Sequence, residues 1–343
     1  MKDIRIYDFE FNLLCIMTDV ISSQWHILYN GVGTYEGHFR MEDEISNIIL
    51  SNKYIVITQG DLQAICTGRI VNDELIVCGR TVNWILTKRV RPPFRAREIF
   101  GESYTDPETV LLYCLKKGFI EPPKINSDGL EDDDTIDENK AVSNFIIPEP
   151  TGATPFTYHF WRSSAHDLSE LTIELCKKLN RGHRVIFDID NKCWRFEFIY
   201  PKENDILLSK DAKNVYDITY TEDIQNEASG GWYPATLDDS DGADNTWCYI
   251  LSEEKKGIYA WDSVLNYSGQ SAATDALQKL KVTDSTKGKL RNLEYIKDYN
   301  LGDIVSVFVK FGQFERLSPC IINGVDIQIT RDYSFQEPDL ANL

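Results

Sequence analysis

The sequence has 343 residues, 42% of them hydrophobic, and a formal net charge of −18. This length fits two or three domains of ordinary size, and the hydrophobic fraction is that of chains that bury a core, which excludes global disorder. The acidic balance argues against a tight contact with nucleic acid, because such binding depends on basic side chains that release counterions from the phosphates.

The first hundred residues predict antiparallel β structure. Apolar and polar residues alternate over short stretches, and turn residues such as Asn30-Gly31 separate them. Strands this closely spaced curl into a barrel or a sandwich. A helix-like segment follows at 81–86, and Pro92-Pro93 stops any helix. The expected strands are residues 4–8, 13–17, 24–29, 34–39, 54–59, 62–71 and 74–79.

The next segment contains a helix start and an acidic run. Asp106-Pro107-Glu108 predicts a helix N-terminus, because aspartate caps free N–H groups and proline fits the first helical position. Apolar residues between Val110 and Leu115 then share one side of this helix. Carboxylates crowd residues 126–139, and since like charges repel and stay solvated, this run predicts an exposed acidic loop.

A second helix leads into a hairpin. Asp167 can cap the helix, Gly182 is expected to close it in a left-handed conformation, and the apolar face comprises Leu168, Leu171, Leu175 and Leu179. Residues 185–187 and 194–198 flank a turn and predict two strands, the second with strict alternation. Helix and hairpin together form a small α+β unit inserted between larger β regions.

The remainder returns to strands, interrupted by one helix at 269–281. Val325, Ile327 and Ile329 alternate with polar residues, as a half-buried strand requires. The expected strands are residues 214–220, 246–251, 257–261, 290–295, 303–311, 316–322 and 325–333.

Residues that could carry chemistry do not form a recognisable site. The five histidines lack a metal-binding spacing, and the eight cysteines form no Cys-x-x-Cys pair, which predicts reduced, buried thiols. The segment 238–245 resembles a calcium loop, but aligning Gly242 with its turn glycine puts Leu237 and Cys248 at ligand positions. We therefore expect no catalytic group, no metal and no cofactor.

No part of the sequence predicts a membrane span. The apolar runs have strand length, well below the ~18 residues of a spanning helix. The N-terminus alternates charged and apolar residues and lacks the core of a signal peptide, so we expect the protein to be made and to stay in a cytoplasm.

Basic residues concentrate around Pro92-Pro93, against the acidic background. Arginine and tryptophan are favoured at interface cores, so one interpretation is a docking strip for an acidic neighbouring subunit. The alternative is a solvated basic face, which composition alone favours. The candidate interface residues are Arg80, Trp84, Lys88, Arg89, Arg91, Arg95 and Arg97.

Four segments, in this order, resemble the tail-tip hub family of siphophages, which is related to baseplate hub proteins of contractile tails and to the N-terminal hub region of tail-associated lysins. The first segment comes directly after a β-hairpin and consists of a Gly-Arg pair, then an apolar stretch, then a pair of basic residues. The others are a helix and hairpin, a strand, and a Tyr-x-Leu-Gly-Asp-x-Val element. They lie at residues 79–89, 175–200, 214–223 and 299–305.

The resemblance implies a mainly β fold with α+β insertions. It implies two β-barrel-like hub domains, at residues 1–100 and 204–343, the second with a helical insertion at about 262–282. A small inserted α+β domain would occupy residues 101–203 and carry the acidic loop 126–139.

The same resemblance implies a structural role in the virion tail, after assembly in the bacterial cytoplasm. Two similar domains in each chain of a homotrimer make a pseudo-sixfold ring, which lets a sixfold tail tube meet a threefold tip. The implied partners are a tail tube or distal tail protein, a central spike or tip protein, and the tape measure protein. DNA would pass the acidic lumen without specific binding.

Two other functions stay open. A tail-associated cell-wall hydrolase is one, although the chain ends at Leu343, shortly after the last expected strand, and leaves no room for such a domain. A carbohydrate-binding adhesion module is the other; however, Trp194, Phe196 and Phe198 alternate as a core face does.

Overall fold

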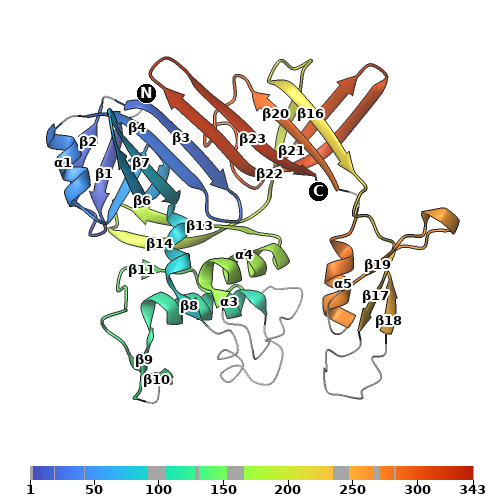
Figure 1. Cartoon of the computed structure of the whole chain (residues 1–343), viewed down its shortest axis with the longest axis horizontal. Coiled ribbons are helices and arrows are strands. Elements are labelled where there is room, and N and C mark those ends of the chain that lie inside the picture. The colour runs from blue at the N-terminus through green and yellow to red at the C-terminus, as the bar shows by residue number, and fades with distance from the viewer. Residues whose placement is uncertain are drawn as a thin grey trace. The chain divides into compact units, whose positions relative to one another are not determined.

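The computed structural model describes residues 3–18, 20–41, 43–91, 106–127, 131–152, 166–234, 247–265, 270–281 and 283–342. Strands dominate these residues, which confirms the mainly β fold class (Figure 1). The chain divides into two compact units. The first unit comprises residues 1–218 and 287–341 with residue 343, and the second comprises residues 219–286 with residue 342.

The N-terminal strands of the first unit confirm the expected antiparallel structure. They follow one another in the order β3-β4-β7-β6-β5-β1-β2. Alternate residues such as Trp25, Tyr35 and Phe39 are buried, as the period-two pattern requires. The strands are β1 (Ile4–Asp8), β2 (Leu13–Met17), β3 (Val20–Leu28), β4 (Thr34–Arg40), β5 (Ile55–Gln59), β6 (Leu62–Val71) and β7 (Glu74–Thr81).

A long strand, β22 (Phe314–Thr330), joins the N-terminal strands to the C-terminal ones. Its first part pairs with β21 (Asp303–Phe311), and its part from Gly324 to Thr330 pairs with β3. One sheet of thirteen strands results (Figure 1). The other C-terminal strands of this sheet are β15 (Lys202–Ser209), β16 (Val215–Asp223), β20 (Thr283–Leu290) and β23 (Ser334–Asn342).

Two expectations at the C-terminal end were wrong, and one strand was missed. Residues 316–322 and 325–333 were expected as two strands, yet β22 continues through Asn323-Gly324, a sequence typical of hairpin turns, and changes partner there. Residues 291–298 form turns, with positive φ at Asn292 and Ile296, where a strand was expected. The strand β23 was not predicted at all.

Two helices of the first unit begin at the predicted N-caps, and the predicted hairpin is present. Asp106 accepts a hydrogen bond from the Thr109 N–H (2.8 Å) at the start of α3 (Pro107–Leu115), and Asp167 accepts one from the Glu170 N–H (2.8 Å) at the start of α4 (Leu168–Lys178). The expected hairpin is present as β13 (Gly182–Asp188) and β14 (Cys193–Ile199). Shorter elements are η1 (Val82–Lys88), β8 (Val90–Arg91), η2 (Lys116–Ile120), β11 (Phe145–Ile146) and β12 (His166–Asp167).

Two local predictions in this region need correction. Asn180, with φ of 51°, takes the left-handed position after α4, and Gly182 instead begins β13. Within 126–139 the chain is not only a loop, because β10 (Glu131–Ile136) pairs with β9 (Pro123–Ile125). The register places Asp132 opposite Lys124, and such a cross-strand pair of opposite charges favours the hairpin. A nine-residue helix, α1 (Asp43–Ser51), was also missed.

One hydrophobic core serves both the N-terminal strands and the α+β segment. It contains Tyr7 of β1, Phe11 of the β1–β2 turn, and Phe187 and Trp194 from the hairpin, together with the apolar faces of α3 and α4. The rings of Phe11 and Phe187 stack with centroids 4.2 Å apart. The division at residue 100 into a barrel and an inserted domain stays a prediction, but the two segments fold around shared side chains.

The second unit is a three-stranded sheet with one helix. Strands β17 (Gly230–Pro234), β18 (Trp247–Leu251) and β19 (Asp262–Val264) lie in the order β18-β17-β19, and α5 (Gln270–Gln278) packs on the sheet through Ala273 and Leu277. The predicted strand 246–251 and helix 269–281 are confirmed within a few residues. The strand expected at 257–261 is wrong, since Gly257, with φ of 63°, opens the short η3 (Gly257–Tyr259).

Candidate subunit interface

The described members of the predicted basic strip differ in their exposure and in their contacts. Arg80 is exposed at the end of β7, opposite Thr34 of β4. Trp84 is half-buried in η1 against the shared core, and the Lys88 ammonium lies 4.1 Å from the centre of its ring. Arg80 and Lys88 are the members whose side chains are exposed among those that the structure describes.

Arg89 makes contacts within the subunit. Its guanidinium donates to the Lys140 carbonyl (2.9 Å) and lies over the ring of Phe119, 5.7 Å from the centroid. Arg91 belongs to β8 and pairs with His166 of β12 through the backbone. Arg95 and Arg97 lie outside the described residues. The strip therefore stays a hypothesis, with Arg89 holding two segments of its own chain together.

A charged groove of about 440 Å³ lies beside Arg80. Strands β3, β4, β7 and β22 form it, and its rim includes Glu36 of β4 and a pair in which His26 Nδ1 lies 2.6 Å from Asp326 Oδ1. The floor is rigid, because Trp25 packs on Tyr35 and is fixed by Gln59. The pairing of β22 with β3 across the sheet creates this groove, and no local signal in the sequence could have found it.

His38 is bound on both sides by carboxylates on the same sheet. Its Nδ1 lies 2.9 Å from Glu74 Oε1 and its Nε2 lies 3.0 Å from Glu36 Oε1. The hydrogen bond to Glu74 is the main cause that raises the pKa of His38, and the bond to Glu36 adds to it. This part of the surface therefore changes charge with pH.

A larger groove of about 840 Å³ lies between the β5–β6 turn, residues 290–298 and strands β22 and β23. Its polar wall is held in place by Gln336 of β23, which accepts from the Tyr299 hydroxyl (2.9 Å) and from the Tyr295 N–H (2.7 Å). Its charged lining residues are Asp61, Arg291, Glu294, Lys297 and Asp298. A polar, solvent-accessible lining of this kind is typical of the rim of a protein interface.

The Tyr-x-Leu-Gly-Asp element has a structural role in the first unit. Asp303 accepts from the Asn300 N–H (2.9 Å) and from the Asn204 side chain (2.8 Å), which ties the turn to β15. Gly302 has φ of 83°, and a Cβ there would lie 2.6 Å from the ring of Tyr29. The glycine in this motif is therefore required by both the turn and the neighbouring ring.

Tyr29 connects three parts of the first unit. Its hydroxyl donates to the Ile199 carbonyl (3.1 Å), its N–H donates to the Asn323 carbonyl (2.8 Å), and its carbonyl accepts from the His183 N–H (3.0 Å). The ring lies against Gly182 as well, where a Cβ would lie 2.4 Å away. Small residues in two distant motifs thus make room for one aromatic side chain.

A buried polar cluster sits next to Tyr29. Asn83 donates to the Gly31 carbonyl (2.7 Å) and accepts from the Val185 N–H (2.6 Å), while His183 Nδ1 lies 2.8 Å from Asn30 Oδ1. Complete burial lowers the pKa of His183 to about 3, so this imidazole is neutral at physiological pH. The cluster satisfies backbone groups at the joint between η1 and the hairpin and positions no reactive group.

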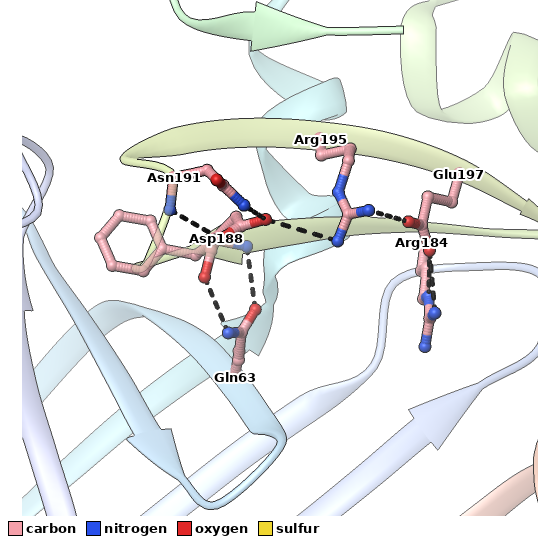
Figure 2. Close-up of polar contacts among 7 residues, drawn as sticks. Gln63, Arg184, Asp188, Asn191, Arg195 and Glu197 are labelled. Carbon is pink, nitrogen blue, oxygen red and sulfur yellow. Dashed lines mark hydrogen bonds and ion pairs between the residues drawn. The ribbon is translucent and has the colours of Figure 1, made fainter. Parts of the chain in front are cut away.

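The outer face of the hairpin carries a row of charges (Figure 2). Arg184 binds Glu197 through two nitrogens (3.0 and 2.8 Å), Arg195 binds the other oxygen of Glu197 (2.7 Å), and Arg195 also lies 3.5 Å from Asp188. Hydrogen bonds from Asn191 are the main cause that lowers the pKa of Asp188. The Gln63 side chain of β6 donates to the Phe187 carbonyl (2.9 Å) and accepts from the Phe187 N–H (2.9 Å), and these two bonds tie the hairpin to β6.

The described residues contain no group of three or more His, Cys, Asp or Glu side chains placed to hold a metal ion. The segment 238–245 lies outside them. All eight cysteines are free; five are buried, as expected, while Cys15, Cys78 and Cys248 are partly exposed. No helix in the described ranges is both long and apolar enough to cross a bilayer.

Comparison with known proteins decides the family. Residues 3–229 match the family described as Siphovirus ReqiPepy6 Gp37-like protein. The chain belongs to this family. No curated protein matches the sequence.

Solved structures share the fold of almost the whole chain. The 43 kDa tail protein of prophage MuSo2 from Shewanella oneidensis has a TM-score of 0.60 at 9% identity, covering 99% of this chain and 98% of its own. The tail protein from Neisseria meningitidis MC58 gives 0.55 at 9% identity, with 99% and 96% covered. Prophage tail protein gp18 from Listeria monocytogenes EGD-e gives 0.53 at 14% identity, with 99% and 94% covered. The resemblance to phage tail proteins is thus confirmed at the level of family and fold.

Proposed function

We propose that the chain is a structural subunit of a phage tail tip, a hub that joins the tail tube to the tip. The observation that carries this proposal is the similarity to a prophage tail protein along 99% of the chain, in a family of siphovirus proteins. Its action would be geometric and would need no catalytic group.

In this proposal three copies form a ring. Strand β22 links two strand-rich regions of each chain, which in the proposal are the two barrel-like hub domains at 1–100 and 204–343. Two such regions in each of three copies present six similar surfaces to a sixfold tube, and three copies of one surface to a threefold tip. The proposed neighbours are a tail tube or distal tail protein, a central spike or tip protein, and the tape measure protein.

The basic residues have a place in this ring. Arg80 and Lys88 are exposed cations in a chain of net charge −18, so the acidic surface of a neighbouring copy would attract them. Charge complementarity of this kind orients partners during assembly more than it adds affinity. We include Trp84, Arg89, Arg91, Arg95 and Arg97 in the proposed interface region, as the sequence predicts.

The acidic balance suits the channel of the ring. Carboxylates that line a passage repel DNA phosphates, so that DNA moves through without being trapped. An electrostatic map of the assembled ring is expected to show a negative lumen, and a basic or neutral lumen would refute this part of the proposal.

The mass of the protein in solution tests the ring. We expect a species of about three times the 39.4 kDa chain mass in native mass spectrometry. Electron microscopy of the particle, with antibody against this chain, should place it at the distal end of the tail. A strictly monomeric protein that is absent from the tail end would contradict the proposal.

A peptidoglycan-release assay tests the non-enzymatic role. We expect no release of soluble fragments by the purified protein, with a known cell-wall hydrolase as the positive control. Clear lysis would show that a hydrolase activity is present and would overturn the purely structural interpretation.

A further inference from the structure

The small sheet of the second unit exposes one aromatic face. Along β17 and β18 the side chains alternate, so that Trp232, Trp247, Tyr249 and Leu251 project from the same side. The register sets Trp232 opposite Tyr249, and Val264 of β19 extends the row. We call these five residues the aromatic face.

The other side of the sheet is already covered. Tyr233, Leu265, Ala273 and Leu277 form a core between the sheet and α5, with Cys248 and Ile250 packed against it. The helix is visible beside β17, β18 and β19 in Figure 1. The fold of the unit therefore does not require the aromatic face to be apolar.

The exposure of this face is large for such residues. Trp232 is 43% exposed, Trp247 48%, Tyr249 42%, Leu251 56% and Val264 64%. Contiguous apolar surface of this kind marks a site of interaction, and tryptophan and tyrosine are the residues that contribute most at protein interfaces. The nearby Tyr259 and Ile258 of η3 are exposed too, at 70% and 82%.

Cations elsewhere in this chain sit on aromatic rings. Lys88 lies 4.1 Å from the centre of the Trp84 ring, and Arg181 lies 4.7 Å from that of Tyr200. In the described parts of the chain, no lysine or arginine lies over Trp232, Trp247 or Tyr249. Trp232 and Tyr249 contact each other, with ring centroids 5.1 Å apart and planes at 55°, and the exposed parts of the three rings can accept a cation from another molecule.

The rim of the face is acidic. Glu253 and Glu254 come shortly after the end of β18 at Leu251, and Asp262 lies in β19, where it accepts a hydrogen bond from the Tyr249 hydroxyl (2.8 Å). Lys255, next to Glu254 in the sequence, forms ion pairs with Glu227 and with Glu253 (3.6 Å to the latter). Residues 219–286 contain no arginine or histidine, and their carboxylates far outnumber their lysines.

We propose that the aromatic face binds a partner protein through a segment that presents arginine or lysine side chains among apolar ones. Guanidinium and ammonium groups are attracted to the ring faces and to the carboxylates of the rim, while apolar side chains cover Leu251 and Val264. A second copy of this acidic unit does not supply the required charge, and the phosphates of a nucleic acid are repelled by it.

Calorimetric titration of the full-length protein tests the proposal. The probe is a synthetic peptide that alternates arginine and leucine, and the control peptide carries glutamate in place of arginine. We expect binding of the arginine peptide only. Trp232→Ala and Trp247→Ala remove rings without changing charge, and each is expected to weaken binding about tenfold.

Matched variants separate ring contact from general charge attraction. Tyr333→Ala removes a side chain of similar exposure (55%) from the first unit and should leave the affinity unchanged. Trp247→Phe keeps an aromatic ring at this position and should retain most of the affinity. Loss of affinity in Trp247→Ala but not in Trp247→Phe would then point to the ring itself. Equal affinity of all variants would overturn the proposal, as would tighter binding of N-acetylglucosamine oligomers than of the arginine peptide.

Discussion

At the scale of single residues, Glu108 shows how a carboxylate can be buried without instability. Its side chain is 1% exposed, and it accepts hydrogen bonds from the Arg181 guanidinium (2.9 Å), the Thr151 hydroxyl (2.8 Å) and the Thr151 N–H (3.0 Å). Arg181 in turn stacks on Tyr200, 4.7 Å from the ring centre. One residue of α3 thus ties together the segments on either side of α4.

Replacing Glu108 should lower stability strongly. Glu108→Ala leaves the Arg181 charge without its partner in a nearly buried position, and we expect a loss of about 3 kcal/mol in the free energy of unfolding. Glu294→Gln is the control, because its pair with Lys297 is exposed and contributes about 0–1 kcal/mol. Urea unfolding followed by circular dichroism measures both losses. Equal losses would mean that the buried pair contributes no more to the free energy of unfolding than the exposed one.

Two histidines make stability depend on pH in opposite directions. The pKa of His38 is raised above 6.5 by its bonds to Glu74 and Glu36, so its contribution is fully present below pH 6.5 and is lost as the pH rises through the folded value. The pKa of His183 is lowered from 6.5 to about 3 by burial, so below pH 6.5 the unfolded chain binds a proton that the folded chain does not. Stability therefore decreases on acidification from pH 6.5.

Variants should separate the two effects. His38→Gln is expected to flatten the decline of unfolding free energy above pH 6.5, and His183→Gln is expected to flatten the decline on its acid side, although it lowers stability at neutral pH. Urea unfolding at a series of pH values is the measurement. If His183→Gln keeps the acid slope of the unchanged protein, buried His183 is not its cause.

At the scale of elements, glycines determine where separate segments can approach. Gly302 has φ of 83° and faces Tyr29, whereas Gly312 has φ of 61°, and a Cβ added there would have no atom within 4 Å. Both alanine variants incur the cost of a left-handed residue, about 1 kcal/mol. The collision with Tyr29 is added only at Gly302.

Comparing these two glycines isolates the cost of the collision. We expect Gly312→Ala to lower the free energy of unfolding by about 1 kcal/mol and Gly302→Ala to lower it by about 3 kcal/mol. Thermal and urea unfolding of the two variants provide the comparison. Equal losses would show that the Tyr29 ring moves aside freely and does not hold the turn.

Local elements were largely predictable because their causes are local. The caps Asp106 and Asp167 act on N–H groups three residues away, and alternation over a few residues is enough to predict β4 or β14. The exceptions were elements whose local sequence preference is overridden by pairing with distant segments of the chain. Asn323-Gly324 has the sequence of a turn, but pairing with β3 on one side and β21 on the other keeps it extended.

At the scale of the whole molecule, the edge strand β2 of the sheet bears on how copies can associate. Among the described strands, β2 pairs only with β1, and it exposes Leu13 (48%) and Ile16 (42%). Helix α1 contacts β2 (Figure 1), and the apolar residues that β2 still exposes offer a neighbouring chain a place to bind. In the proposed ring we expect β2 to lie at the contact between copies.

A charge at this edge should prevent assembly without unfolding the chain. Ile16→Lys is expected to shift the native mass from a trimer toward the 39.4 kDa monomer, because lysine on an edge strand opposes strand pairing. Ile70→Lys, at a similarly exposed position of β6, should leave the mass unchanged. A trimer that persists in Ile16→Lys would place the contact elsewhere.

The candidate surfaces were harder to foresee than the elements. Arg80 and Lys88 were found in the sequence as basic residues, but only the fold separates them from Arg89, which binds Lys140 within its own chain. The groove beside Arg80 needs Asp326, which is far away in the sequence and adjacent in the sheet. The aromatic face was missed because alternation indicates two sides of a strand and cannot say which side a helix will cover.

The sequence alone determined the mainly β class, the capped helices, the hairpin and the resemblance to tail hubs, because these depend on residues close together along the chain. Only the tertiary structure decided that β22 unites the two strand-rich regions, that Tyr29 fits between Gly182 and Gly302, and that one side of the small sheet stays exposed. These features arise from contacts between distant segments, whose register and packing no local pattern specifies.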